Sequence, residues 1–319
     1  MSTRDFGLRL LGLLASLLVA SMLIFLATNA LPGSVANVLL GTQAAPGEVA
    51  ALEERLGLNR PLAVRYVEWI GGVLQGSFGK TMIGGRDVLG EILPRLGVSV
   101  WLITLGMAVA LLIAVPLGSF AALRRRRASG FAASALSQLG LSIPAFWAGI
   151  WLVIIFAVHW RILPAGGYVP LRKNPVAWAA HLVLPVTSLA LVQGSLLARY
   201  VRSAVIEVTN EDWYRTARAV GWSRLGALRR HGFRNIAISL LTVIGLQVAT
   251  LLVGAIIIEQ VFAIDGLGSR LLLAVSQRDL VLVQTIVLLL VWAVLVINFV
   301  VDALYQALDP RLAKTGART

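Results

Sequence analysis

The chain has 319 residues, of which 58% are hydrophobic and only 13% charged, and its mean hydropathy is +0.84. Soluble domains carry about 25% charged residues, so this composition predicts an integral membrane protein and excludes an ordinary soluble domain. The formal net charge of +13 would suit a nucleic-acid-binding protein, but the arginines lie between apolar segments, where the positive-inside rule explains them better. The sequence contains no cysteine and only three widely spaced histidines, which excludes disulfides and Cys-ligated metals and argues against a His-rich metal site.

The first apolar segment covers about residues 8–31 and follows Arg4 and Arg9. A secretory signal peptide has a similar start, but its apolar region is about 7–15 residues long, whereas about 20 residues are needed to cross a bilayer. We therefore expect a retained span with the N-terminus in the cytoplasm. Residues 32–97 then form an outer loop. In this loop the apolar residues of segment 66–74 recur at helical spacing, which predicts an amphipathic helix that either packs on the protein or lies on the membrane surface.

Five further apolar segments bring the number of predicted spans to six, so that both ends of the chain lie on the same side. These segments cover about residues 98–123, 131–158, 181–198, 237–262 and 280–308. The run Arg124–Arg127 and the arginine-rich loop 199–236 mark the cytoplasmic side, which places both termini in the cytoplasm. The sequence thus predicts an all-α membrane protein that forms a single transmembrane domain over residues 1–319.

Residues 209–221 form a polar island within the predicted cytoplasmic loop and are typical of a short helix. Thr209 occupies the position of an N-cap with Asp212 three residues on, and Gly221 stands where a left-handed residue would end the helix. Such a helix is a good handle for a soluble partner, and the alternative is an ordinary basic loop. Trp213 and Tyr214 would either anchor in the partner's pocket or cover the inner end of the helix bundle.

Few polar side chains lie within the predicted spans. Glu259 lies near the outer end of its span, and Gln193, Gln247 and Asn298 are amides in the middle of theirs. Each could line a translocation pathway, but a structural partner for the carboxylate and interhelical hydrogen bonds for the amides are the commoner roles. The sequence shows no catalytic triad, no pair of catalytic carboxylates, no metal-spaced cluster and no phosphate-binding Gly-x-x-x-x-Gly-Lys-Ser/Thr loop. It therefore predicts neither a catalytic nor a metal site, and any nucleotide must be bound by another chain.

The segments Asp212–Gly221 and Leu228–Asn235 resemble the EAA loop of ATP-binding-cassette (ABC) importer permeases. The triplet Arg215-Thr216-Ala217 is the variant of the dipeptide/oligopeptide/nickel group. Four further motifs are similar to those of that group, and the resemblance covers nearly the whole chain: Leu56–Leu62, Leu163–Gly167, Gly266–Gly268 and Leu308–Arg311. Two prolines of the group's pattern are replaced, by Ser239 and by Asp265, and these departures bear on local bends and on the substrate class.

The resemblance implies the type I ABC importer permease fold, with an extracytoplasmic loop after the first span and a cytoplasmic coupling helix. Such a chain forms half of the translocation pathway for short peptides in the inner membrane of a prokaryote and is not itself an enzyme. Its partners would be a second homologous permease, two cytoplasmic ATPases that bind ATP and Mg, and an extracytoplasmic binding protein that delivers the peptide. The resemblance assigns coupling to the ATPases to the following residues: Glu211, Asp212, Trp213, Tyr214, Arg215, Thr216, Ala217, Arg218, Ala219 and Gly221.

Two alternatives remain open. The same architecture also imports nickel or a metal chelate, with selection made by the binding protein. An ion-coupled secondary carrier is an alternative of another class, and it would predict a carboxylate in the middle of the membrane and no docking helix.

Overall fold

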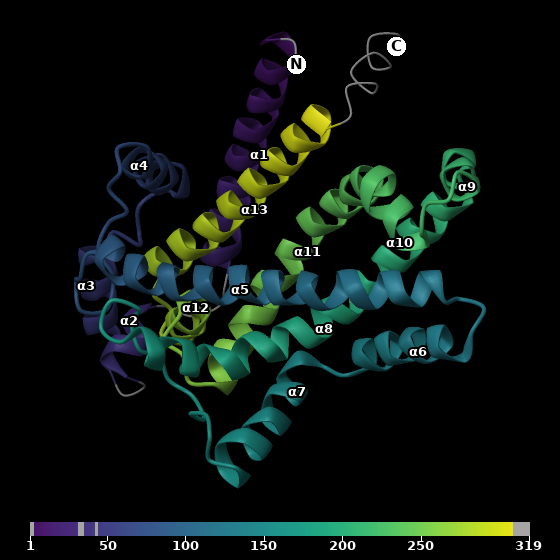
Figure 1. Cartoon of the computed structure of the whole chain (residues 1–319). Coiled ribbons are helices and arrows are strands. Elements are labelled where there is room, and N and C mark those ends of the chain that lie inside the picture. The colour runs from purple at the N-terminus through teal and green to yellow at the C-terminus, as the bar shows by residue number, and fades with distance from the viewer. Residues whose placement is uncertain (1–2, 31–34, 42–43, 309–319) are drawn as a thin grey trace. The chain divides into compact units, whose positions relative to one another are not determined.

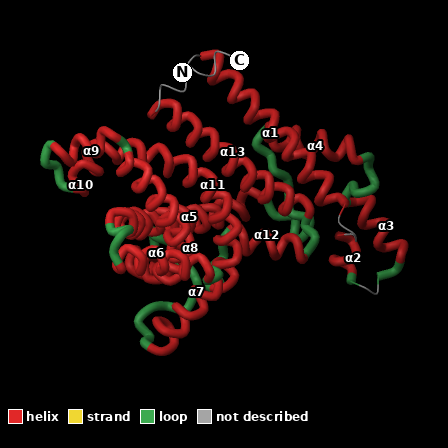
Figure 2. The backbone as a smooth tube through the Cα atoms, turned by 90° about the vertical axis from the view of Figure 1, so that its right-hand side faces the viewer, coloured by secondary structure: helices red, strands yellow, loops and turns green. Residues whose placement is uncertain are grey.

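The computed structural model describes residues 3–30, 35–41 and 44–308. These residues form helices joined by loops, and the one β-type pairing among them is an isolated antiparallel bridge between Lys80 and Asp87 (Figures 1 and 2). In chain order, the α-helices are α1 (Thr3–Ala30), α2 (Val35–Leu40), α3 (Pro46–Arg55), α4 (Leu62–Leu74), α5 (Val88–Leu123), α6 (Ala128–Ser142), α7 (Ala145–Leu152), α8 (Pro175–Asn210), α9 (Asp212–Ala219), α10 (Arg224–Ala227), α11 (Phe233–Val261), α12 (Leu267–Ser276) and α13 (Leu280–Leu308). Two π-helical turns, η1 (Val153–His159) and η2 (Leu228–Gly232), follow α7 and α10.

Five helices in the described ranges are long and apolar enough to cross a membrane: α1, α5, α8, α11 and α13. A sixth crossing results if α6 is counted together with α7 and η1 as one bent span. The all-α membrane architecture expected from the sequence is therefore confirmed.

The segment 131–158, which the sequence predicts as one span, is broken into two helices that differ in direction by 96°. The break lies at Ile143 and Pro144, which have extended backbone angles (φ −96° and ψ 120° at Ile143). A residue before proline is disfavoured in the α region because of the clash with the proline ring, and proline has no N–H to continue the helix. The chain thus bends at Ile143 and Pro144, and the prediction of one continuous span over residues 131–158 is wrong.

Helix α8 is much longer than the span predicted at residues 181–198. It begins at Pro175, where the Asn174 side chain accepts hydrogen bonds from the N–H groups of Val176 (3.1 Å) and Ala177 (3.0 Å). It ends at Asn210, so residues 199–210 are helical and do not belong to the loop. Its 36 residues correspond to about 54 Å at 1.5 Å per residue, well beyond the roughly 30 Å of a hydrocarbon core. The segment that follows Asn210 thus begins at the end of a long helix.

The described chain divides into two compact units, and α5 and α13 each contribute to both. The larger unit comprises residues 100–264 and the chain from residue 297 onward. Within it, α6 and the second half of α5 run alongside α8 (Figures 1 and 2). The contact between α5 and α8 is close at Gly118, where an added Cβ atom would lie 2.5 Å from the carbonyl oxygen of Ala198 and 2.7 Å from Cβ of Val201.

The smaller unit comprises residues up to 99 together with 265–296. Its apolar core is built from α5, α12 and α13 around Ile92, Leu267, Leu282 and Ile286. The predicted amphipathic helix is α4, and it packs on the protein in this unit. The ring of Phe25 on α1 lies 5.4 Å from that of Tyr66 and 6.0 Å from that of Trp69, measured between centroids. Of the two placements that the sequence leaves open for this helix, packing on the protein fits its aromatic face.

Several of the loop motifs have a direct structural role. At Gly57 (φ +68°) helix α3 ends with the N–H of Leu58 donating to the carbonyl of Glu53, at 2.9 Å. Gly166 must be glycine because an added Cβ would lie 2.2 Å from the carbonyl oxygen of Phe262. Most of the motif Leu308–Arg311 lies outside the described residues.

Both residues that replace the expected prolines, Asp265 and Ser239, make hydrogen bonds in the structure. Asp265 accepts a charge-assisted hydrogen bond from Nε of Arg95 at 2.8 Å, which joins the connection before α12 to the start of α5. Ser239 lies inside α11, where its hydroxyl donates to the carbonyl of Asn235 at 3.2 Å. A serine there keeps the backbone N–H that a proline would remove.

We expect Gly118→Ala to destabilise the larger unit by about 1–3 kcal/mol, because the new methyl group must displace the α8 backbone. The measurement is the apparent unfolding midpoint of the purified chain in detergent, with Gly12→Ala as the matched control. Gly12 is also helical and nothing lies within 4 Å of its added Cβ. Both changes gain the same helix propensity, so equal midpoints would contradict the close contact between α5 and α8.

Candidate functional site

Helix α9 is the eight-residue element that the sequence assigns to coupling. Glu211 separates it from α8 by adopting an extended backbone (φ −67°, ψ 144°). At its other end Gly221 has φ +98°, as expected for a left-handed residue. The N–H groups of Gly221 and Trp222 donate to the carbonyls of Arg218 (3.2 Å) and Ala217 (3.1 Å), which is the Schellman pattern. The C-terminal end of α9 is therefore defined by hydrogen bonds, and the chain changes direction sharply at Gly221.

The predicted N-cap is wrong. Thr209 is still part of α8, and its hydroxyl donates to the carbonyl of Ile206 at 2.9 Å. The N-cap residue is Glu211, whose side chain makes no capping bond. A threonine hydroxyl bonds back to the preceding turn when its own residue remains helical, and this is the case here because α8 continues to Asn210.

Tyr214 and Trp213 hold α9 onto its own chain. Tyr214 is only 7% exposed, and its hydroxyl donates to the carbonyl of Arg224 at 3.2 Å. Trp213 is half-buried, and an added Cβ at Gly232 would lie 3.5 Å from its ring and 2.8 Å from Val208. Of the two roles considered for these aromatics, covering the inner end of the bundle fits Tyr214. It is not available as an anchor in a partner's pocket.

The apolar side chains exposed at this end of the chain come from the turn after α9, which the sequence analysis did not single out. Val220 is 76% exposed, Leu225 on α10 is 44% exposed and Trp222 is 39% exposed. The guanidinium of Arg230 lies over the Trp222 ring at 5.5 Å from its centroid. Exposed apolar residues next to a polar helix face are typical of a docking surface. The signal in the sequence was the apolar character of Val220 and Trp222 beside a glycine.

The remaining coupling residues form a polar surface around this turn. Most of their side chains are exposed, and they are Glu211, Asp212, Arg215, Thr216, Arg218 and Ala219, with Ala217 half-buried. Asp212 and Arg215 form an exposed ion pair at 3.6 Å, and the Arg218 guanidinium donates to the carbonyl of Trp222. The structure thus brings all predicted coupling residues onto one short, anchored helix and its exit turn.

The four candidate pathway residues do not form one cluster. Nε2 of Gln193 on α8 donates to Oε1 of Gln247 on α11 at 2.6 Å, which is the interhelical role expected for such amides. Glu259 is 1% exposed and lies twelve residues further along α11, about 18 Å away by helical rise. Asn298 lies on α13 beside Gly245, whose added Cβ would be 3.5 Å from the Asn298 oxygen.

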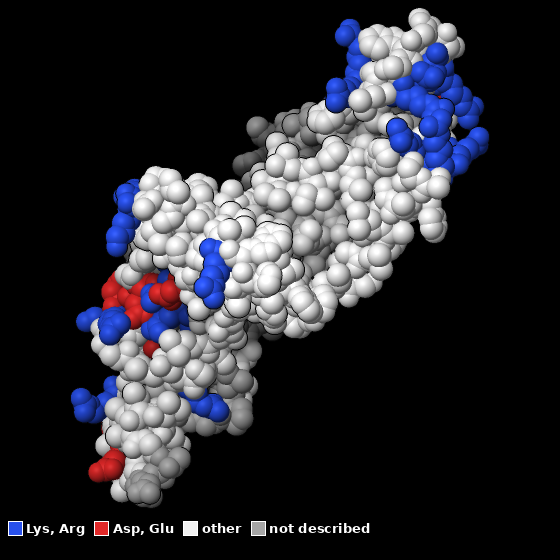
Figure 3. Space-filling view, turned by 60° about the horizontal axis from the view of Figure 1, so that its bottom comes forward, with Lys and Arg blue, Asp and Glu red and all other residues white. Residues whose placement is uncertain are grey.

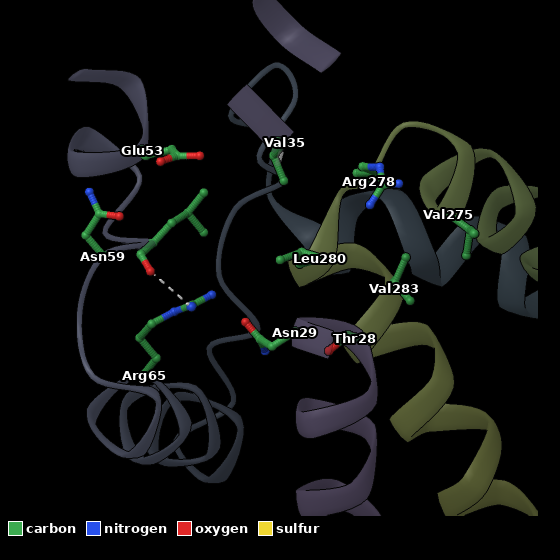
Figure 4. Close-up of a pocket in the computed structure, with 11 residues that line it drawn as sticks. Thr28, Asn29, Val35, Glu53, Asn59, Arg65, Val275, Arg278, Leu280 and Val283 are labelled. Carbon is green, nitrogen blue, oxygen red and sulfur yellow. Dashed lines mark hydrogen bonds between the residues drawn. The ribbon is translucent and has the colours of Figure 1, made fainter. Parts of the chain in front are cut away.

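The smaller unit contains a polar pocket that sequence reasoning missed (Figure 4). Its volume is about 300 Å³. The lining residues come from α1 to α4 and from the α12–α13 region, and they are Thr28, Asn29, Val35, Glu53, Leu58, Asn59, Arg65, Val275, Arg278, Leu280 and Val283. No local pattern links these segments, because they are up to 255 positions apart in the sequence.

This pocket presents charges of both signs. Glu53 and Arg278 face it from opposite sides, and Arg65 extends into it from α4 (Figure 4). Nη1 of Arg65 donates to the carbonyl of Leu58 at 3.3 Å. Desolvation by burial lowers the pKa of Arg65 below its ordinary value, although a guanidinium remains charged at neutral pH. The pocket can therefore receive a small group that carries both a positive and a negative charge.

Comparisons with known proteins agree with these features. The family model "Binding-protein-dependent transport system inner membrane component" matches residues 114–314, and the model of its N-terminal part matches residues 4–100. A putative peptide transport system permease protein of Brucella suis biovar 1 is 37% identical over 93% of this chain and 94% of its own length. The glutathione transport system permease protein of Salmonella typhi is 38% identical over 95% of this chain and 97% of its own length.

A similar fold is present in the methionine ABC transporter MetNI, solved in inward-facing conformations. The TM-score is 0.53 at 19% sequence identity, and the match covers 68% of this chain and 97% of the MetNI chain. At this identity the likeness concerns the fold alone.

We expect Gly221→Ala to loosen the end of α9, because an L-residue with a side chain is strained by about 1–2 kcal/mol in the left-handed region. Amide hydrogen exchange of residues 213–222 in the detergent-solubilised chain measures this effect. Gly221→Asn should exchange more slowly than Gly221→Ala, since asparagine tolerates a positive φ better. Identical exchange in the native chain and in Gly221→Ala would show that the turn is not fixed by Gly221.

Proposed function

Because the chain belongs to the family of binding-protein-dependent transport system inner membrane components, as the sequence resemblance predicted, we propose that it forms half of the translocation pathway of an importer for short peptides. The chain is a multi-pass membrane permease of a bacterial ABC transporter. The substrate class is supported by the names of the relatives, which are a peptide permease and a glutathione permease.

The observation that carries the coupling role is the placement of α9 at the tip of α8. The eight residues of α9 begin one residue after a 36-residue helix, and Tyr214 ties them to α10. A force on the exposed side of α9 would therefore act at the end of the helix that continues into the membrane-spanning part of α8. Two ATPases that bind ATP and Mg would supply this force when they close and separate, and a second permease would complete the pathway.

The orientation in this proposal follows from charge. If the arginines at residues 124–127 and in the coupling loop mark the cytoplasmic side, both termini are cytoplasmic and the loop of residues 32–97 is outside. The resemblance to importer permeases assigns the chain to the inner membrane. This arrangement brings α9 to the ATPases and the pocket to the binding protein.

The polar pocket suits contact with the loaded binding protein. A short peptide has an ammonium group at one end and a carboxylate at the other, and the pocket offers the carboxylate of Glu53 and the guanidinium groups of Arg65 and Arg278. We assign to it a contact that helps the binding protein to release its peptide into the pathway.

We expect Val220→Asp to abolish coupling in the reconstituted complex of this chain with its second permease and ATPases. Val220 would be buried against the ATPase in the complex, and losing such a contact costs about 1.5–3 kcal/mol of binding free energy. Peptide uptake should therefore fall at least about tenfold. The matched control is Val176→Asp, since Val176 is 80% exposed and lies at the far end of α8 from α9. Unchanged uptake in Val220→Asp would contradict docking at the exit turn, and uptake driven by a proton gradient without ATPase would restore the ion-coupled carrier.

We expect Glu53→Gln to lower the stimulation of ATP hydrolysis by loaded binding protein about two- to tenfold, since a half-buried charged contact contributes about 0.5–1.5 kcal/mol. Hydrolysis without binding protein should not change. Glu54→Gln is the control, because Glu54 is exposed and does not line the pocket. If both variants lose stimulation equally, overall charge matters and the pocket does not.

A further inference from the structure

A pocket of about 430 Å³ in the larger unit is lined by six arginines. They come from three separate segments, namely the α5–α6 connection (Arg124–Arg127), α9 (Arg218) and α10 (Arg224). The other lining residues are Ala122, Leu123, Thr209 and Tyr214, and none of the lining residues is acidic. Figure 3 shows Lys and Arg side chains gathering at the end of the molecule that carries α9 and α10, with almost no acidic surface among them.

Protein contacts hold the walls of this arginine pocket in place. Nη1 of Arg224 donates to the carbonyl of Leu123 at 3.4 Å, and Nη2 of Arg125 donates to Oδ1 of Asn210 at 3.3 Å. Both bonds join the end of α5 to the coupling segment, and both acceptors are neutral. Like charges gathered in this way repel one another, and an anion that accepts several guanidinium hydrogen bonds would remove that repulsion.

An apolar groove of about 810 Å³ adjoins the arginine pocket. Its residues come from α5, α10, η2 and α11, and they are Leu111, Val115, Pro116, Ser119, Phe120, Leu123, Leu225, Leu228, Arg229, Phe233, Ile236, Ala237, Leu240, Leu241 and Ile244. Along α5 it extends from Leu111 to Leu123, about 18 Å by helical rise. This is close to the thickness of one leaflet, about 15 Å, or half of the hydrocarbon core.

The two cavities meet at the end of α5. Leu123 lines both of them. Phe120 lines the groove, and the guanidinium of Arg124, which lines the pocket, stands over the Phe120 ring at 4.7 Å from its centroid. The arginine pocket thus lies next to an apolar groove whose length is close to the thickness of one leaflet.

We propose that this junction binds one anionic phospholipid, with the phosphate among the arginines and an acyl chain along the groove. Arginine matches phosphate geometry in bidentate hydrogen bonds, and the groove matches an aliphatic chain in polarity and length. A neighbouring apolar helix would fill the groove equally well, but it would leave the six positive charges without a counter-charge. The combination of charge and hydrophobicity therefore favours an amphiphile.

The bound headgroup would connect the α5–α6 connection with α9 and α10. Arg218 both lines the pocket and donates to the carbonyl of Trp222 in the exit turn of α9. An anionic lipid would consequently stabilise the coupling helix against the end of α5, independently of which substrate the transporter carries.

The test uses the full chain in detergent with phosphatidylglycerol or phosphatidylcholine of identical acyl chains, and native mass spectrometry counts the retained lipids. We expect one retained phosphatidylglycerol per chain, at least about tenfold preferred over phosphatidylcholine. The double variant Arg126→Gln with Arg127→Gln should lose this preference. The matched control, Arg230→Gln with Arg234→Gln, removes the same charge from the same region outside the pocket and should keep it.

Filling the groove tests the acyl-chain half of the proposal. Ala237→Trp, and the smaller Ala237→Leu, should both lower phosphatidylglycerol retention while an elution profile unchanged from the native chain shows that they fold. Equal retention of the two lipids, or an equal loss of the preference in the pocket and control double variants, would overturn the proposal. The arginines would then act only through the net surface charge. Undiminished lipid binding with lost assembly of the second permease in the Ala237 variants would assign the groove to that subunit instead.

Discussion

A backbone N–H or C=O group surrounded by hydrocarbon has no water to bond, and this constraint governs the whole chain. It explains why most of the described residues are helical, since a helix pairs its backbone groups within itself. Helix α8 carries the same regular hydrogen bonding beyond the span predicted from its apolar run. Because it does not end where the apolar residues end, α9 follows one residue after a long helix and not after a loop.

The parts of this molecule that were predictable from sequence are those decided by local chemistry. Gly221 was expected to be left-handed because residues with a side chain are strained there, and its φ of +98° agrees. The apolar runs predicted the long helices for a similar reason, since about 20 apolar residues suffice to cross a membrane whatever their neighbours are. The same apolar-run argument missed the 96° break at Ile143 and Pro144, because hydropathy does not report a change of direction.

The features that escaped prediction depend on residues far apart in the sequence or on where a helix stops. Thr209 has the side chain of an N-cap, but α8 continues through it, so its hydroxyl bonds backward. For Tyr214 the sequence left two roles open, and its burial and its bond to the carbonyl of Arg224 decide for the role within the chain. Asp265 looked like a loss relative to the expected proline, yet it pairs with Arg95, 170 residues earlier. The polar pocket and the arginine pocket likewise collect side chains from separate helices.

The break between α6 and α7 has a consequence for the surroundings of the protein. Where a helix is interrupted, the last carbonyls of one segment and the first N–H groups of the next lose their partners within the helix. In pure hydrocarbon each such group would cost several kcal/mol. If the turn at Ile143 and Pro144 lies within the hydrocarbon, its free backbone groups need hydrogen-bond partners from water or from another polypeptide. One side of this bent segment would then face water or protein and not lipid tails.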